Sequence, residues 1–239
     1  MPKSEFEKLV ESYVRQGLTR REAAFKAKLQ LLRDKRSGRK PQELVYLGVS
    51  DWIPRQDGSE FRIWYFLDPE SGAVKRVFGG RETSDFSLDP LDVVKIKLSG
   101  KDERNLNEVS AATAEVIGKE DIDILRKASI YKRLKELFEI PRGERVDVIT
   151  EGQIIYPPKQ TSTGSLRISL TDIFDEPPDI VTVFIPPEMQ DEEFNMDDHV
   201  IVVGTFRKAQ VNLMDTYTIN PILIRKASPP EEVFEELEE

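Results

Sequence analysis

Short strand-like segments fill two regions of the chain and recur in a similar order in both. In each segment apolar and polar residues alternate, or β-branched residues cluster, as is typical of strands. The first region holds segments 44–49, 60–67, 73–78, 93–98 and 109–117, and the second holds 146–156, 165–172, 180–185, 199–208 and 216–224. Turns rich in Gly, Pro and Asp separate several of them, which favours hairpins. The sequence therefore predicts two small β domains.

Helical patterns occur before the first strand region and between the two regions. Capping-box spacing begins at Ser4 and again at Thr19, and apolar residues follow each box at helical intervals. Residues 1–40 are therefore predicted to form a helical hairpin followed by a basic linker. Residues 119–145 are predicted to form a connecting helix, and residues 228–239 a disordered acidic tail.

The predicted strand order points to one known architecture. Five strands, with hairpins between the first three and a helix or loop between the third and fourth, describe the OB-fold, a small Greek-key barrel. We expect a mainly β protein with some α structure, in which two tandem five-stranded OB-fold barrels occupy residues 41–118 and 146–227. Gly204 falls in the fourth strand of the second barrel, where a barrel strand bends sharply. Residues 187–196 are expected to form a short helix before that strand.

Composition weighs against several classes of enzyme. The 239-residue chain has no cysteine and one histidine, His199, and it lacks the Gly-Lys-Ser/Thr ending of a phosphate-binding loop. Cysteine nucleophiles, thiolate metal sites, multi-histidine zinc sites and nucleotide hydrolysis therefore have no support. We expect no catalytic residue, no cofactor and no metal.

The chain also lacks the signals that direct proteins to membranes or to secretion. It begins MPKSEFEKLV, without the apolar run of a secretion signal, and no segment approaches the ~20 apolar residues that a membrane span needs. We therefore expect a cytoplasmic protein with no membrane partner. Charged residues make up 33% of the chain, which, in the absence of cysteine, is typical of a thermophile.

The net charge of −9 conceals an uneven distribution along the chain. Residues 1–40 carry 12 basic and 5 acidic side chains, whereas residues 146–227 carry 6 basic and 13 acidic ones. A basic arm attracts phosphate and an acidic domain repels it. We therefore expect the arm to contact nucleic acid, and the second barrel to bind protein or to dimerise. Alternatively, the arm is the solvated side of a hairpin that docks a partner. The candidate contacts in the arm are Arg36, Arg39 and Lys40.

In the first barrel, the candidate nucleic-acid contacts centre on segment 60–67, whose alternate residues share one side of the strand. One side carries an arginine beside two aromatic rings, a combination that stacks on bases and neutralises phosphates. Neighbouring segments are expected to extend this surface. The candidates are Arg62, Trp64, Phe66, Arg76, Phe78 and Trp52. In the alternative interpretation, Trp64 and Phe66 pack under the N-terminal helices or against the second barrel.

The second barrel has fewer candidate contacts. Alternation in segments 165–172 and 180–185 directs Arg167 and Phe184 outward, away from the apolar core positions. Basic residues in a loop and in the fourth strand would complete a groove. The candidates are Lys159, Arg167, Phe184, Arg207 and Lys208.

The whole pattern resembles archaeal single-stranded-DNA-binding proteins of the replication protein A type. The likeness is carried by the helical stretch 6–32, by the run HVIVVGTFRK followed by TYTINPILI, and by the acidic tail. The resemblance implies binding of single-stranded DNA, in preference to RNA, during replication, recombination or repair. The zinc-finger cysteines of some members are missing here, which removes a metal-stabilised module.

Partner proteins are expected at the two ends of the chain. The tail resembles the acidic tip of bacterial single-strand-binding proteins, so replication or repair proteins are expected to capture Phe234 and Leu237, or the N-terminal helices. Two alternatives remain open at this stage. One is an OB-fold scaffold subunit of a replication or ribosome-associated complex, and the other is an RNA-binding translation factor.

Overall fold

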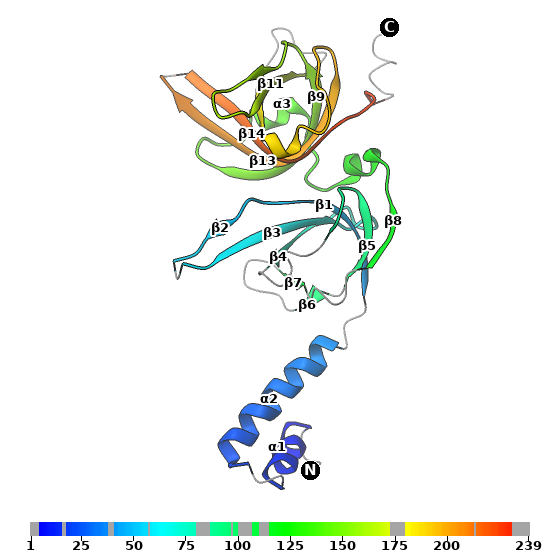
Figure 1. Cartoon of the computed structure of the whole chain (residues 1–239), viewed down its shortest axis with the longest axis vertical. Coiled ribbons are helices and arrows are strands. Elements are labelled where there is room, and N and C mark those ends of the chain that lie inside the picture. Colours follow the sequence, from blue (N-terminus) through cyan, green and yellow to red (C-terminus); the bar gives the residue numbers. More distant parts are fainter. Residues whose placement is uncertain are drawn as a thin grey trace.

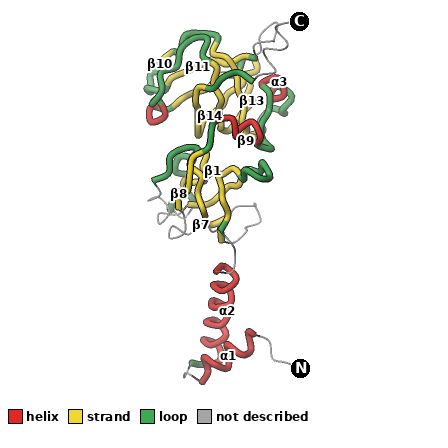
Figure 2. Tube along the Cα trace, turned by 90° about the vertical axis from the view of Figure 1, so that its right-hand side faces the viewer, coloured by secondary structure: helices red, strands yellow, loops and turns green. Residues whose placement is uncertain are grey.

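The computed structural model describes residues 5–15, 18–37, 41–56, 58–79, 87–96, 98–99, 107–109, 115–172, 180–212 and 214–230. Over these ranges the chain forms two β barrels, one stacked on the other, and a helical hairpin (Figure 1). The hairpin stands apart from both barrels in two perpendicular views (Figure 2). The molecule is mostly β, as the sequence predicts.

The hairpin consists of α1 (Glu5–Arg15) and α2 (Arg20–Ser37). The capping box predicted at Thr19 is present, because the Thr19 backbone N–H donates to the Glu22 carboxylate over 3.0 Å and the Glu22 N–H donates to the Thr19 hydroxyl over 3.4 Å. Ala23 and Ala27, one turn apart on α2, are fully buried. Such small side chains let two helices approach closely.

The first barrel follows the OB-fold order. Its strands are β1 (Gln42–Val49), β2 (Ile53–Pro54), β3 (Glu60–Leu67), β4 (Val74–Gly79), β5 (Asp92–Ile96), β6 (Leu98–Ser99), β7 (Asn107–Val109) and β8 (Glu115–Lys119). β1 pairs antiparallel with β3 and β5, and β3 pairs with β4. The parallel pairing of β4 with β7 closes the barrel. The predicted fourth strand is thus divided into β5 and β6, and the predicted fifth overlaps β7 and β8.

The second barrel has the same order with longer strands. They are β9 (Arg145–Ile154), β10 (Lys159–Gln160), β11 (Leu166–Thr171), β12 (Val181–Ile185), β13 (His199–Val211) and β14 (Met214–Lys226). β9 pairs with β11 and β13, and the parallel pairing of β12 with β14 closes this barrel. The expected helix before β13 is reduced to the 3-10 turn η4 (Pro187–Met189).

Gly204 bends β13 as expected. The pairing of β13 with β14 shifts register between Val203 and Gly204. A Cβ atom at position 204 would lie 2.4 Å from the carbonyl oxygen of Asn220, so the neighbouring strand leaves no space for a side chain. Glycine is therefore required where the barrel closes.

The prediction of one connecting helix is wrong. The segment forms a 3-10 helix, η3 (Ile122–Lys127), and a single-turn helix, α3 (Leu134–Leu137). Between them the Lys132 N–H donates to the Ile149 carbonyl oxygen of β9 over 2.8 Å. Apolar residues of the two pieces enter different cores, which one straight helix would not allow.

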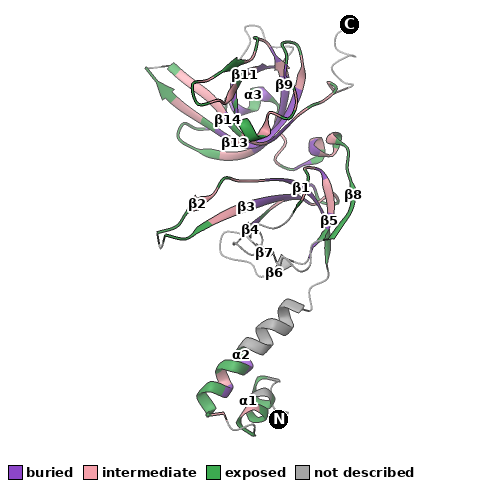
Figure 3. Cartoon of the chain, in the orientation of Figure 1, coloured by how far each residue is buried: buried purple, intermediate pink, exposed green. Residues whose placement is uncertain are grey.

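Three apolar clusters hold the barrels together. Each barrel has an interior cluster, and a third cluster contains residues of both barrels and of η3. This third set, called here the shared core, includes Val45, Leu47, Tyr65, Leu67, Leu125, Ile149, Ile201, Val203 and Leu223. In Figure 3 the buried parts of β1 and β3 lie toward the second barrel. The two barrels therefore pack as one unit through an apolar interface.

Candidate nucleic-acid interface

The expected stacking surface on β3 does not face outward. Trp64 is 4% exposed and Phe66 is fully buried, and both belong to the interior cluster of the first barrel. Their rings lie 5.5 and 5.6 Å from the Tyr46 ring, centroid to centroid. The predicted alternation is present, but the side assigned to the ligand is the interior. Without rearrangement of the barrel, neither ring is accessible to a base.

Arg76 does not extend the side of β3 that carries Trp64. It pairs in register with Tyr65, on the opposite side of the sheet, and forms an ion pair with Asp147 of the second barrel at 3.5 Å. Phe78 lies in β4, and its side chain is outside the described residues. Arg76 therefore connects the two barrels.

Trp52 and Arg62 lie against each other at the base of the β2–β3 hairpin. The Arg62 guanidinium carbon is 4.3 Å from the centroid of the Trp52 ring, a cation–π contact. Both residues are half-buried. Arg62 thus occupies one face of the ring that was expected to stack on a base.

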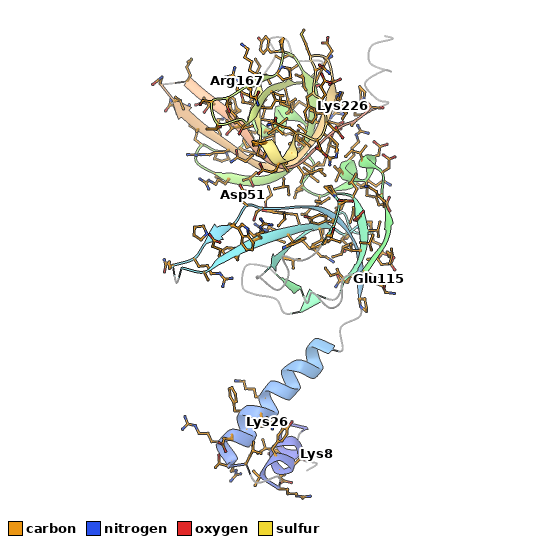
Figure 4. All side chains as sticks on the ribbon, viewed as in Figure 1. Lys8, Lys26, Asp51, Glu115, Arg167 and Lys226 are labelled. Carbon is orange, nitrogen blue, oxygen red and sulfur yellow. The ribbon has the colours of Figure 1, made fainter. Side chains whose placement is uncertain are left out.

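The outer side of the second barrel brings three predicted contacts into one row. Lys159 of β10 pairs in register with Arg167 of β11, and Arg167 pairs with Phe184 of β12. Their neighbours along the strands, including Ile168 and Val183, are buried in the core, so the three side chains point outward. Phe184 is 36% exposed. Arg167 lies in the upper part of this barrel, away from the first (Figure 4).

A second row continues from the first around the outside of the closed barrel, onto the wall of β9 and β13 that also carries Ile149 and Ile201 of the shared core. Register pairs connect Ser169, Thr182, Thr218, Arg207 and Arg145 across β11, β12, β14, β13 and β9. Arg145 and Arg207 are both exposed and lie directly opposite each other, and Asp147 is the next residue on the same side of β9. Like charges directly opposite each other destabilise a sheet. The two rows together are called here the outer strip.

The four cations of the outer strip are available to a ligand. Within the described ranges, no acidic side chain forms an ion pair with Lys159, Arg167, Arg207 or Arg145. Neither row of the outer strip contains an acidic residue. Guanidinium and ammonium groups without partners on a sheet lined with hydroxyls form a surface that attracts phosphate.

Many carboxylates of the second barrel are paired with cations away from the outer strip. Six of its carboxylates form ion pairs with cations off the outer strip: Asp147 with Arg76, Glu151 with Arg126, Asp191 and Glu192 with Arg225, Asp198 with Lys226, and Asp215 with Arg142. The total charge of the barrel therefore does not describe the charge of its outer strip. The count of acids and bases in the sequence favoured a protein-binding barrel, because such a count cannot separate the charge of the outer strip from the total charge of the barrel.

The remaining candidate contacts differ in position. Lys208 is turned away from Arg207, and its Nζ donates to the Phe138 carbonyl oxygen over 2.8 Å. Lys208 therefore supports the barrel end and is not part of the outer strip. The other candidates lie outside the described residues or have side chains that do: Arg36, Arg39, Lys40, Phe234 and Leu237.

Sequence reasoning missed Arg145 as a contact. Near Arg145 in the sequence, only the alternation of Arg145 and Asp147 with core residues indicates that the Arg145 side chain lies on the outer side of β9. Its position opposite Arg207 depends on the pairing of β9 with β13, strands that lie more than 40 residues apart in the chain.

A buried polar network lies where the barrels meet the start of the C-terminal segment. Glu151 accepts hydrogen bonds from Arg126 Nη2 at 2.7 Å and from the Tyr131 hydroxyl at 2.5 Å, and His199 Nε2 lies 2.9 Å from its Oε2. Arg126 also donates to the Ser228 carbonyl oxygen over 2.6 Å. Burial alone would raise the pKa of Glu151, but the hydrogen bonds from His199, Arg126 and Tyr131 lower it to about 2. The network, with Glu151 ionised, therefore fixes η3 to β9 and β13.

Among the described residues, no group of three or more His, Asp or Glu side chains is arranged to hold a metal ion. In the same part of the chain, no helix has the length and apolar character needed to span a membrane.

No model of a known protein family matches the sequence, and a search of curated proteins finds no match. Among solved structures, the chain is similar to a p204 HINb domain at 12% identity and a TM-score of 0.43, covering 78% of this chain and 96% of that chain. It is also similar to a replication protein A heterotrimer bound to ssDNA, at 12% identity and a TM-score of 0.43, covering 77% of this chain and 50% of that chain. A single-stranded DNA binding protein from Thermus aquaticus matches at 13% identity and a TM-score of 0.27, covering 80% of this chain and 96% of that chain. These similarities are too distant to assign a family or a function.

Proposed function

We propose that this protein binds single-stranded nucleic acid, in the first instance DNA, through the outer strip of its second barrel and without catalysis. Lys159, Arg167, Arg207 and Arg145 neutralise backbone phosphates, and Phe184 stacks on a base. The hydroxyls between the cations donate to phosphate or sugar oxygens. The biological role we propose is the coating and protection of single strands during replication, recombination or repair.

One observation carries this proposal. An exposed aromatic ring stands in register with Arg167, on a strip whose four cations have no ion-pair partner among the described residues. A purely structural strip would be expected to pair its cations with the many carboxylates of the same barrel. Here the described carboxylates that form ion pairs do so with other cations.

Titration of a labelled 12-nucleotide oligo(dT) at several salt concentrations tests the proposal. Each phosphate contact on a single strand contributes about −0.7 to the slope of log K against log salt, so four cations give a slope of about −3. The variant Arg145→Gln with Arg207→Gln is expected to bind more weakly, with a slope of about −1.4. Failure of the normal protein to bind at low salt, or a slope near zero, would contradict the proposal.

A protein-interaction scaffold is the second candidate function. The exposed apolar residues Val211 and Met214, at the tip of the β13–β14 hairpin, favour it. Pull-downs from cell extract with and without nuclease separate the two functions, because partners that persist after nuclease treatment support the scaffold.

Competition between DNA and RNA oligomers of equal sequence decides between the two nucleic acids.

A further inference from the structure

The equivalent surface of the first barrel lies against the second barrel. Arg167 and Phe184 of the outer strip lie on β11 and β12, the second and third OB-fold strands of the second barrel, and the counterparts of these strands in the first barrel are β3 and β4. The outer side chains of these two strands include Tyr65, Leu67 and Val74, which belong to or pack against the shared core. Tyr65 is 7% exposed and Leu67 is fully buried. The centre of that surface is therefore already occupied by protein.

Contacts of three kinds hold the second barrel over this surface. The shared core includes Ile149 and Ile201 of the second barrel, packed with Tyr65 and Leu67 in one apolar cluster. Gly48 of β1 lies so close to the second barrel that an added Cβ would be 2.5 Å from the Ile222 carbonyl oxygen. The ion pair of Arg76 with Asp147 and the hydrogen bonds of Arg126 to Glu151 add polar contacts across the junction.

We propose that a single strand binds to the second barrel alone, and that the first barrel is a rigid support instead of a second binding domain. This inference rests on the proposed function, because it concerns the ligand of the same outer strip. A strand that entered the surface of β3 and β4 would have to separate the barrels and expose the shared core to water. The ligand class is therefore a short single-stranded segment, of the length that one OB-fold covers.

The proposal predicts how affinity depends on ligand length. One OB-fold covers roughly 4–16 nucleotides, so a 12-nucleotide strand fills most or all of the site. Doubling the length then adds only alternative positions of binding: on a site of about 8 nucleotides a 12-mer has about 5 positions and a 24-mer about 17, an increase of about threefold in affinity. Two linked sites used together would raise the affinity by roughly 10²–10⁴-fold.

The experiment compares oligo(dT) of 12 and 24 nucleotides with the full chain, by fluorescence anisotropy for affinity and by native mass spectrometry for stoichiometry. We expect less than about a tenfold difference in affinity, with two protein molecules on each saturated 24-mer. We also expect Phe184→Ala to weaken binding of both lengths by the same factor, about 5- to 100-fold. Phe25→Ala, which removes a 66% exposed ring from α2, serves as the matched control and is expected to leave both affinities unchanged.

Two results would overturn the inference. One is a 24-mer that binds at least about 100-fold more tightly than the 12-mer with one protein per strand. The other is an affinity for the 24-mer that Phe184→Ala leaves unchanged, because such a result would reveal a second stacking site. Absence of binding to both lengths at low salt would instead contradict the proposed function itself, and the inference with it.

Discussion

Reversing the charges of Arg167 and Arg207 together is expected to weaken binding of single-stranded DNA by at least about a hundredfold at low salt. A charge-assisted hydrogen bond contributes about 1.5–3 kcal/mol, so the loss of two such contacts accounts for this factor before repulsion is considered. The new carboxylates would also repel phosphate. Both arginines are exposed and form no ion pair with another described residue, so the free energy of unfolding should change by less than about 0.5 kcal/mol for each substitution.

The matched control reverses Lys119 and Lys127. Both lysines are exposed, lie in β8 and η3, and give the same change in net charge as the arginine pair. If binding depended only on the total charge of the molecule, the two double variants would lose equal affinity. An equal loss of affinity, measured by anisotropy titration in one buffer, would show that the outer strip is not the binding site.

Gly48→Ala is expected to destabilise the protein by about 2–4 kcal/mol. Gly48 has φ +148°, a backbone conformation that L residues rarely adopt, and its added Cβ would approach the Ile222 carbonyl oxygen to 2.5 Å. The backbone of the second barrel would have to move away, which disturbs the shared core. Guanidinium unfolding monitored by tryptophan fluorescence measures the loss.

Gly58→Ala separates backbone strain from the contact between the barrels. Gly58 has φ +79°, and nothing lies within 4 Å of its added Cβ. This variant should lose only about 1 kcal/mol, the cost of placing a residue with a Cβ in that region. Equal losses for the two glycine variants would show that the close packing of the barrels at Gly48 does not contribute to stability.

The strand order and most strand positions were predictable because each depends on local pattern. Alternation in β11 and β12 identified Arg167 and Phe184 as outward-facing, and the structure agrees. Gly204 was identified from its place inside a long β-branched run, and the register shift beside it confirms the bend. These features require only that one side of a strand be apolar.

The sequence pattern did not show which side of a strand faces the barrel interior where both sides are apolar. In β3, Trp64 and Tyr65 are neighbours on opposite sides, yet they are 4% and 7% exposed. One side faces the barrel interior and the other faces the second barrel, so periodicity shows which residues share a side but not which side is the interior. The connecting segment was mispredicted for a related reason, since its apolar residues serve two different cores.

Photo-crosslinking identifies directly which barrel holds the strand. A 12-nucleotide oligo(dT) carrying 5-iododeoxyuridine at a central position is irradiated in complex with the full chain, and mass spectrometry identifies the attached residue. We expect attachment at Phe184 or within β11 and β12, and its loss in the variant Arg167→Glu with Arg207→Glu. Attachment confined to the first barrel, at Trp52 or Phe61, with none on the second, would contradict it.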